Sequence, residues 1–491
     1  MRAPIHRAQA AGLLVLAAAL LSAPSGAAQE AEAPPAEAAD AVEAVAARAV
    51  GAPAAAGGLL EGARGVVTFD QLDELLLWRD AMSPIGQRSL QQLLEVRLVE
   101  HLGKAAGITI TDEDVAERTA ALDDEIRASG KQGGLEELMR EGGVKADDFR
   151  RYLRLSLVHE ELTRRALEIP AGTEVTPDQQ ELWLQNQLKE RGTKAEEFPW
   201  TGGVVVTSGD LTIGRDEFAA HIRSETPENE QREACYLLLL ERAVRARMPE
   251  LGEAGASAAL DREMERRRAE AEADPKFRGA SYEQILTARG LSVEAVRRDP
   301  AIQAAALAHE AVDREHDDES LRAEYEKERR RFDSLFGEAV EVRILYMNAS
   351  PRPDDPLRPS FKAVEEKLRE LREGIRSPED FLAAVEIHSQ DRGTRERKGL
   401  LGNLSRAGDS EDLAGLRQAA FAVVDRAPDA CAGEVFGPVR LTNGAALAML
   451  GDRIPAPTWP QMSRNVHQDL RRRFLEATLL REQVVSYLDV K

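Results

Sequence analysis

The most informative stretch of this chain lies near its carboxyl end, where residues 435–450 read VFGPVRLTNGAALAML. Two apolar runs, 435–442 and 445–450, flank Asn443-Gly444, the dipeptide that most favours a two-residue hairpin turn. Residues 340–347 form another run of apolar side chains, and this run also predicts a strand. Together these runs predict a small sheet inside a mixed domain covering residues 339–453.

The segments between these strands have helical patterns. Helices are expected over 361–374, which ends in a glycine, over 378–388 and over 411–424. A proline-rich loop is expected over 351–359, and a glycine-rich loop over 393–402. Residues 339–453 therefore combine strands and helices in a mixed domain, whereas residues 66–335 have mostly helical periodicity.

The region 340–452 resembles the parvulin-type peptidyl-prolyl isomerases of the bacterial envelope, of the SurA and PpiD kind. Seven short motifs carry the resemblance: Arg343-Ile344-Leu345, Pro378-Glu379-Asp380-Phe381, Ser389-Gln390-Asp391, Gly399-Leu400-Leu401-Gly402, Ala419-Ala420-Phe421, Gly437-Pro438-Val439 and Asn443-Gly444. The resemblance implies an FKBP-like β-α-β domain joined to helical chaperone domains like the amino-terminal domain of SurA. The expected fold class is α+β and mostly helical.

The positions that match the family's reaction site depart from its usual residues. Those positions are Arg343, Asp391, Asp412, Leu416, Phe421 and Ala446. Arg343 and Ala446 stand where the family usually has histidines. Asp412 and Leu416 stand where a methionine and a phenylalanine usually line the proline pocket, so only Asp391 and Phe421 keep the expected character.

Prolyl isomerisation makes specific demands on such a site. Rotation about an X-Pro bond crosses a barrier of ~20 kcal/mol through a twisted amide, which a catalyst must bind better than either planar isomer. An apolar socket and a short polar network are both needed, and a guanidinium such as that of Arg343 stays charged and cannot act as a neutral imidazole. We therefore expect catalysis to be lost in a domain that still docks extended segments. An active isomerase and a structural envelope scaffold remain the alternatives.

The helical region contains an apparent duplication. Residues 138–150 match residues 285–297 at a constant offset of 147, which pairs Gly143 with Gly290. Short extended pieces at 66–68 and 210–212 lead into helices in a similar way. Two SurA-N-like repeats, 61–200 and 201–338, are the expected domains.

Local patterns support helices inside the first repeat. Leucines at 90, 93, 94, 98 and 102 define one apolar stripe, which predicts a buried helix face. Thr111, followed by Asp112, Glu113 and Asp114, has the composition of a helix amino terminus.

The two ends of the chain have distinct compositions. Residues 1–28 carry basic residues, an apolar run and small residues in the order of a cleaved secretory signal, and the apolar run is shorter than a spanning helix needs. Residues 29–60 are an Ala-, Pro- and Glu-rich leader with few large apolar groups. Apolar spacing in 454–491 predicts a long amphipathic helix. The signal predicts export to the periplasm, without stable membrane insertion after cleavage.

Composition and motifs exclude several classes of function. The formal charge of −21 disfavours nucleic acid, and neither a phosphate loop nor a Gly-x-Ser-x-Gly elbow occurs, so we expect no nucleotide partner and no cofactor. His388 beside Ser389 and Asp391 reads as a helix-terminal histidine, and His309-Glu310 lacks a second ligand at helical spacing, so no metal is expected.

The two cysteines, Cys235 and Cys431, leave one isolated disulfide open. The expected function is that of an ATP-independent periplasmic holdase chaperone. Its partners would be unfolded or extended polypeptides, by resemblance secreted or outer-membrane proteins in transit.

Overall fold

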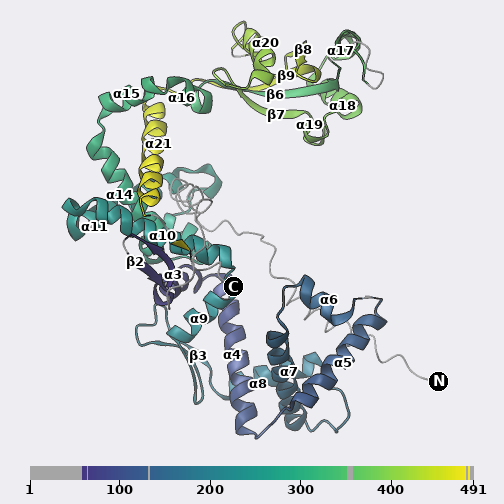
Figure 1. Ribbon diagram of the computed structural model, residues 1–491, viewed down its shortest axis with the longest axis vertical. Helices are drawn as coiled ribbons and strands as arrows, with labels where there is room; N and C mark the ends of the chain where they lie inside the picture. Colours follow the sequence, from purple (N-terminus) through teal and green to yellow (C-terminus); the bar gives the residue numbers. More distant parts are fainter. Residues whose placement is uncertain are drawn as a thin grey trace. The chain divides into compact units, whose positions relative to one another are not determined.

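The computed structural model describes residues 58–63, 65–130, 133–350, 358–428, 430–482 and 485–486. The predicted signal 1–28, almost all of the leader 29–60 and most of the predicted loop 351–359 lie outside these residues. The chain divides into two compact units, one formed by Met1–Ala308 with Phe474–Lys491 and the other by His309–Arg473 (Figure 1).

Helices dominate the first unit, and its strands form two small antiparallel sheets. The helices are α3 (Phe69–Asp80), α4 (Pro84–Ala105), α5 (Asp112–Ala128), α6 (Gly134–Glu141), α7 (Ala146–Ala166), α8 (Pro177–Glu190), α9 (Arg215–Glu225), α10 (Glu228–Arg247), α11 (Gly252–Ala273), α12 (Tyr282–Ala288) and α13 (Val293–Arg298), with 3-10 turns η1 (Pro249–Leu251) and η2 (Pro275–Phe277). The strands are β1 (Gly58–Gly62), β2 (Gly65–Thr68), β3 (Lys194–Ala195), β4 (Val204–Ser208), β5 (Leu211–Gly214) and β10 (Val485–Ser486). Helices α14 (Pro300–Glu315) and α21 (Trp459–Leu480) contribute residues to both units.

The second unit contains a four-stranded sheet with helices. Its elements are α15 (Asp318–Lys327), α16 (Arg329–Phe336), β6 (Ala339–Asn348), α17 (Phe361–Gly374), α18 (Pro378–His388), α19 (Arg392–Glu396), β7 (Leu400–Ser405), η3 (Glu411–Leu413), α20 (Ala414–Val424), β8 (Val435–Leu441) and β9 (Gly444–Ile454). Helices with small antiparallel sheets are an α+β architecture, so the predicted fold class is confirmed.

The order of elements recurs along the first unit. The hairpin β1–β2 leads into α3 and α4, and the hairpin β4–β5 leads into α9 and α10. Gly143 lies between α6 and α7 with a φ of +66°, and Gly290 lies between α12 and α13 with a φ of +74°. The two segments related by the 147-residue offset therefore share a left-handed glycine turn between two helices. The boundaries of the two expected repeats, 61–200 and 201–338, stay a prediction.

Each hairpin gains a third strand, which is near in sequence for the hairpin β4–β5 and distant for the hairpin β1–β2. β3 follows α8 and pairs with β4 through Lys194 and Thr207, and β10 follows α21 and pairs with β1 through Ser486 and Leu60. The strand orders are accordingly β3-β4-β5 and β10-β1-β2. β3 thus completes the sheet that contains the hairpin β4–β5, and β10 completes the sheet that contains the hairpin β1–β2.

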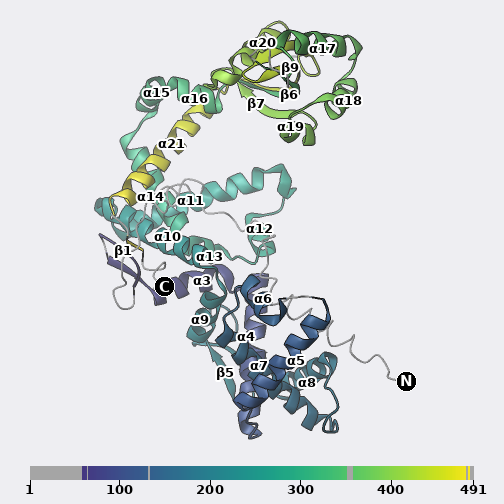
Figure 2. The same ribbon diagram turned by 45° about the vertical axis from the view of Figure 1, so that its right-hand side comes forward.

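The predicted leucine stripe forms part of the helical packing. Leu90, Leu93, Leu94 and Leu98 on α4 are buried, whereas Leu102 is partly buried. α4 contacts α7, and α7 contacts α8, so the three helices lie side by side around a core that includes Trp183 (Figure 2). The helix predicted to start after Thr111 is α5, where Thr111 and Asp114 form a capping box.

The sheet of the second unit has the strand order β7-β6-β9-β8, with every neighbouring pair antiparallel. Side chains alternate along β6, so Val342 and Ile344 enter one apolar core with α20, and Leu345 enters a second core with α17 and α18. β6 and β9 lie in the middle of the sheet, which leaves β7 and β8 as its edges.

Three expected elements differ from the structure. The predicted glycine-rich loop 393–402 is wrong, because α19 and the start of β7 occupy much of it. The predicted terminal helix ends at Leu480 and is followed by β10. The hairpin turn consists of Thr442 and Asn443, because Leu441 pairs directly with Gly444 at the start of β9.

Gly444 fits this position because a Cβ there would lie 2.2 Å from the carbonyl oxygen of Met347. The glycine of the dipeptide therefore permits close approach of β6 instead of completing the turn. Close backbone approach is a common role of glycine inside strands.

Candidate functional site

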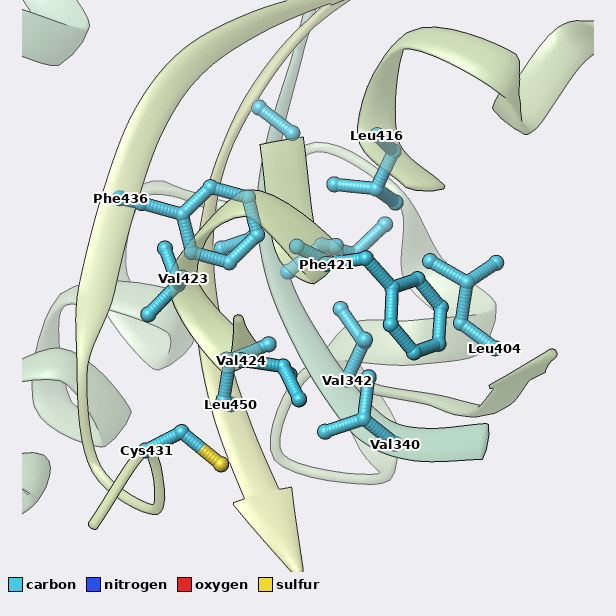
Figure 3. Packing of buried hydrophobic residues seen from close by; sticks show 14 residues of the cluster. Val340, Val342, Leu404, Leu416, Phe421, Val423, Val424, Cys431, Phe436 and Leu450 are labelled. Carbon is cyan, nitrogen blue, oxygen red and sulfur yellow. The ribbon is translucent and has the colours of Figure 1, made fainter. Parts of the chain in front are cut away.

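Three of the six positions matched to the parvulin site lie in one apolar core. Leu416 and Phe421 come from α20, and Ala446 comes from β9. Leu416 and Ala446 are 0% exposed and Phe421 is 4% exposed. The side chains around them fill the space between α20 and the sheet, as Figure 3 shows for Val342, Leu404 and Leu416 around the ring of Phe421. These residues therefore pack as interior and do not line an open socket.

The ring of Phe421 is also covered by a cation. The guanidinium of Arg406 lies 4.3 Å from the ring centre, which is the geometry of a cation–π contact. Arg406 is held there by carboxylates, with Nη2 2.6 Å from Asp425 Oδ1 and Nε hydrogen-bonded to Glu338. The ion pairs raise the pKa of Arg406 and lower the pKa of Asp425. A proline ring could reach Phe421 only if Arg406 moved.

Arg343 lies on the opposite side of the sheet from this core. It stands between Val342 and Ile344 on β6, and both of these neighbours belong to the core under α20, so alternation directs Arg343 to the other face. Its guanidinium donates to the carbonyl oxygen of Lys398 at 3.3 Å and pairs with Glu341 at 3.2 Å. Arg343 and Ala446 therefore do not converge, although both match histidine positions of the family.

Asp391 serves as the amino-terminal cap of α19. Its Oδ2 accepts hydrogen bonds from the backbone N–H of Thr394 at 2.9 Å and from the Thr394 hydroxyl at 2.5 Å. These hydrogen bonds from Thr394 lower the pKa of Asp391. The carboxylate is thus ionised and engaged in a helix cap.

Asp412 lies on η3 and is exposed. Its carboxylate accepts a hydrogen bond from the hydroxyl of Thr442, in the turn between β8 and β9. The contact ties two surface turns together and places no apolar group at the position where the family usually has methionine.

Tyr346 is the residue near this region that the sequence analysis overlooked. It is the direct cross-strand partner of Ala446 and packs against the core under α20. Burial raises the pKa of the Tyr346 phenol, and the negative charge of Asp391 raises it further. The strand periodicity of residues 340–347 was the available signal, because it places Tyr346 on the same face as Val342 and Ile344.

His388 and the two cysteines have structural surroundings that can be compared with the predictions. His388 ends α18 and is half-buried, as expected for a helix-terminal histidine. Cys235 and Cys431 are both buried free thiols, and burial raises the pKa of Cys235 to about 12.

His309 does have a second potential metal ligand at helical spacing, contrary to the prediction from the sequence. Asp313 lies one turn along α14, with its Oδ2 3.6 Å from His309 Nε2, and His467 of α21 approaches the same carboxylate. Helical spacing of four residues places His309 and Asp313 on one face.

Comparisons with known proteins give structural matches only. No family model and no curated protein matches the chain. Among solved structures, the peptidylprolyl isomerase PrsA of Bacillus cereus is 14% identical, with a TM-score of 0.22, over 59% of this chain and 93% of that chain. Two SurA-like chaperones of Campylobacter jejuni are represented by a structure that is 14% identical, with a TM-score of 0.22, over 56% of this chain and 92% of that one.

A PpiC-type peptidyl-prolyl cis-trans isomerase domain is also similar. It is 22% identical to this chain, with a TM-score of 0.18, over 25% of this chain and 98% of that domain. As the sequence motifs predicted, the chain is similar to SurA-like chaperones and to a parvulin-like domain, whereas the similarity to PrsA was not predicted. Identities below 25% and TM-scores this low assign neither an activity nor a client. In the part of the chain that the structure describes, no helix has the length and apolar character to cross a membrane.

Proposed function

We propose that this chain is an ATP-independent periplasmic holdase chaperone for unfolded secreted or outer-membrane proteins. Its parvulin-like domain docks extended client segments and does not catalyse prolyl isomerisation. The observation that supports the loss of catalysis is the burial of Leu416, Phe421 and Ala446 in a filled core, with Arg343 directed to the other face of the sheet. The open edge of β7 supports the docking of extended segments.

The geometry argues against catalysis for a physical reason. A catalyst must stabilise the twisted amide more than either planar form, which requires an apolar socket and polar groups that face the same bond. Here the apolar positions contact one another, Asp391 caps α19, and Arg343 binds the Lys398 carbonyl. No pair among these groups is placed to act on one substrate bond.

The sheet of the parvulin-like domain offers a surface for an extended segment. Among the described residues, β7 pairs with β6 alone, so it is an edge strand. The N–H of Arg406 donates to the carbonyl oxygen of Glu338, so by alternation the N–H of Asn403 points away from β6. Outward main-chain groups at an edge can pair with an added strand independently of the added sequence, which suits a chaperone with many clients.

The opposite edge is less available. The guanidinium of Arg372 donates to the carbonyl oxygens of Gly437 at 2.7 Å and Val435 at 3.3 Å, both on β8. These bonds occupy acceptors that an added strand would need. We therefore assign client docking to β7.

An aggregation assay tests the holdase function. Protein lacking residues 1–28 is expected to suppress aggregation of a urea-unfolded β-barrel client near one chaperone per client, without nucleotide. Light scattering after dilution of the client measures the effect, with an equal mass of serum albumin as control. Unchanged scattering at a several-fold excess would contradict the proposal.

A proline-peptide turnover assay separates the proposal from the isomerase alternative. The expected rate is the uncatalysed background, equal for the wild type and for Asp391→Ala. A rate that rises with protein concentration and is lost in Asp391→Ala would establish catalysis and overturn the assignment of a docking domain.

Photocrosslinking tests where the client binds and whether there are many clients. A photoreactive phenylalanine analogue at Asn403 on β7 is expected to crosslink the unfolded client, whereas the same analogue at exposed Lys367 on α17 is not. In cells, crosslinks from Asn403 to many exported proteins support a chaperone. Crosslinks to one fixed partner would support the scaffold alternative.

A further inference from the structure

Three side chains of types that bind metals lie together in the second unit, on the parts of α14 and α21 that belong to it. His309 and Asp313 come from α14 and His467 comes from α21. His467 Nε2 lies 2.9 Å from Asp313 Oδ1, and His309 Nε2 lies 3.6 Å from Asp313 Oδ2. One ligand atom from each residue lies within 4.8 Å of the other two, and the imidazole ring centres are 4.4 Å apart.

We propose that His309, Asp313 and His467 form a zinc site that links α14 to α21. Two imidazoles and one carboxylate are ligands that Zn²⁺ takes in proteins, with bond lengths near ~2.1 Å. Tetrahedral geometry at those bond lengths separates neighbouring ligand atoms by roughly 3.4 Å. The separations of the two imidazoles from the two oxygens of Asp313, 2.9 Å and 3.6 Å, lie on either side of that value, so rotation of the side chains would bring three ligand atoms to one ion.

The exposure of the three residues is consistent with an accessible metal site. The side chains of His309 and His467 are 17% and 13% exposed, whereas that of Asp313 is 54% exposed. The imidazoles are thus held by packing, and the carboxylate faces solvent. Water can supply a fourth ligand from the solvent side, as it does in zinc sites with three protein ligands.

Arg471 is the group that competes with the cation. Its Nη1 lies 2.7 Å from His309 Nδ1. A guanidinium has no acceptor, so Nδ1 accepts this hydrogen bond and the ring proton is on Nε2. Zinc bound at Nε2 would require the ring proton to be on Nδ1. A protonated Nδ1 donates a hydrogen bond and cannot accept one from Arg471, so the Arg471 guanidinium must turn away.

This competition gives the proposal a distinctive test. In Arg471→Gln, the positive charge is removed and the amide oxygen can accept a hydrogen bond from His309 Nδ1–H. Such an outer partner orients a ligating histidine and increases its basicity. Arg471→Gln is therefore expected to bind zinc several-fold more tightly than the wild type.

Zinc binding should be measured on the chain lacking residues 1–28 after treatment with a chelator. Competition with a chromophoric zinc indicator is expected to give one Zn²⁺ per chain. Co²⁺, as a spectroscopic probe, should show the intense visible bands of a tetrahedral site. His467→Gln should lower zinc affinity at least ~10-fold because it removes one of three protein ligands. His388→Gln, which changes a histidine of α18, should leave affinity unchanged.

A second measurement follows stability. Zinc that binds the folded state raises the melting temperature by mass action. The rise should occur in the wild type and in His388→Gln and be absent in His467→Gln, with circular dichroism confirming that each variant is folded. Lack of zinc binding by the wild type, equal binding by folded His467→Gln, or weaker binding by Arg471→Gln would overturn the site.

Discussion

Asp391 accepts two hydrogen bonds from Thr394 at the start of α19, and this local role dominates its chemistry. The same residue is one of the two matched positions that keep the family's expected character, the other being Phe421. A carboxylate engaged in a cap is stabilised in its charged form. Asp391 therefore contributes to the stability of the fold through the hydrogen bonds that it accepts from Thr394.

Replacement of Asp391 should affect stability and not turnover. Asp391→Ala is expected to destabilise the parvulin-like domain by about 1 kcal/mol, the usual cost of losing an amino-terminal cap, whereas Asp391→Asn should cost less because its amide oxygen can still accept. Urea unfolding monitored by circular dichroism measures the difference. Equal stability of Asp391→Ala and wild type would show that the cap is dispensable.

The acid dependence follows from the same hydrogen bonds. Because the pKa of Asp391 is lowered in the folded state, its stabilising contribution is present above the unfolded pKa of ~3.9. The contribution is lost as the pH falls through the lower folded value. The difference in stability between wild type and Asp391→Ala should therefore shrink at the acid end of this range.

His159 on α7 should make the helical region sensitive to mild acid. Burial lowers the pKa of His159, whose ring lies 5.1 Å from that of Trp183 between centres. In the unfolded chain, histidine titrates near ~6.5. Above that pH His159 is neutral in both states and leaves the free energy of unfolding unchanged. As the pH falls from ~6.5 towards the lower folded pKa, only the unfolded state takes up a proton, so the folded state loses stability. His159→Leu should lose less melting temperature between pH 7.5 and 5.5 than the wild type. An equal loss in both would exclude His159 as a source of the acid sensitivity.

At the level of single residues, the sequence motifs identified which positions match the isomerase site, but not which of those side chains are buried or which face of the sheet they occupy. The motifs located Arg343, Leu416 and Ala446, but burial and the face of the sheet depend on pairing with distant strands. Alternation along β6 could have shown that Arg343 faces away from Val342 and Ile344. His467 gave no local signal, because its partners lie more than a hundred residues earlier in the chain.

Among the elements, the two glycine turns of the repeated segments provide a matched comparison. A Cβ at Gly290 would lie 2.6 Å from the Cα of Ser83, whereas a Cβ at Gly143 would meet nothing within 4 Å. Both glycines have positive φ, which costs an L-residue about 1–2 kcal/mol. Gly143→Ala should show that cost alone, and Gly290→Ala should be clearly more destabilising because backbone must move. Thermal unfolding of both variants measures the difference, and equal losses would contradict the close approach at Gly290.

α21 is held in the second unit by a buried carboxylate. Asp469 is 7% exposed and contacts three guanidiniums, those of Arg331, Arg472 and Arg473. Burial acts to raise the pKa of Asp469, but the hydrogen bonds and charges of these arginines bring it below its usual value. The carboxylate thus remains ionised and links α21 to α16.

Removal of this carboxylate should be costly. Asp469→Ala removes the carboxylate that the three guanidiniums share, while Glu328 still pairs with Arg331 and Arg473. We expect a loss of about 1–3 kcal/mol, less than for a fully buried pair because the arginines are partly exposed. Asp409→Ala, which breaks the exposed pair with Arg330, is the control and should change stability little. Chemical unfolding of the two variants gives the comparison, and similar losses would show that burial of Asp469 is unimportant.

Helix boundaries were predictable where local capping fixes them. α17 and α18 have the predicted limits because Ser360 and Ser377 accept hydrogen bonds from the first turns of these helices. β7 was missed because its residues, LLGNLS, have little intrinsic strand preference and form a strand through pairing with β6. Capping is local in sequence, whereas sheet pairing is not.

For the whole molecule, the pairing of β10 with β1 predicts that residues 485–486 stabilise the first unit. A variant that ends at Glu482 loses β10 and leaves β1 as an unpaired edge. Unpaired edges promote association between chains, so this variant should melt at a lower temperature and scatter more light than a variant that ends at Ser486. Equal behaviour of the two truncations would show that β10 contributes nothing to the first unit.

The positions of the third strands along the chain also fix when each sheet can be completed during synthesis. Synthesis proceeds from the amino terminus, so β3 emerges just before the hairpin β4–β5 that it completes. Among the described elements, the hairpin β1–β2 emerges first, yet its third strand is made last, after the entire parvulin-like domain. Among the described sheets, the first to begin is therefore the last to gain all its strands, and until β10 is made the nascent chain carries an open strand edge.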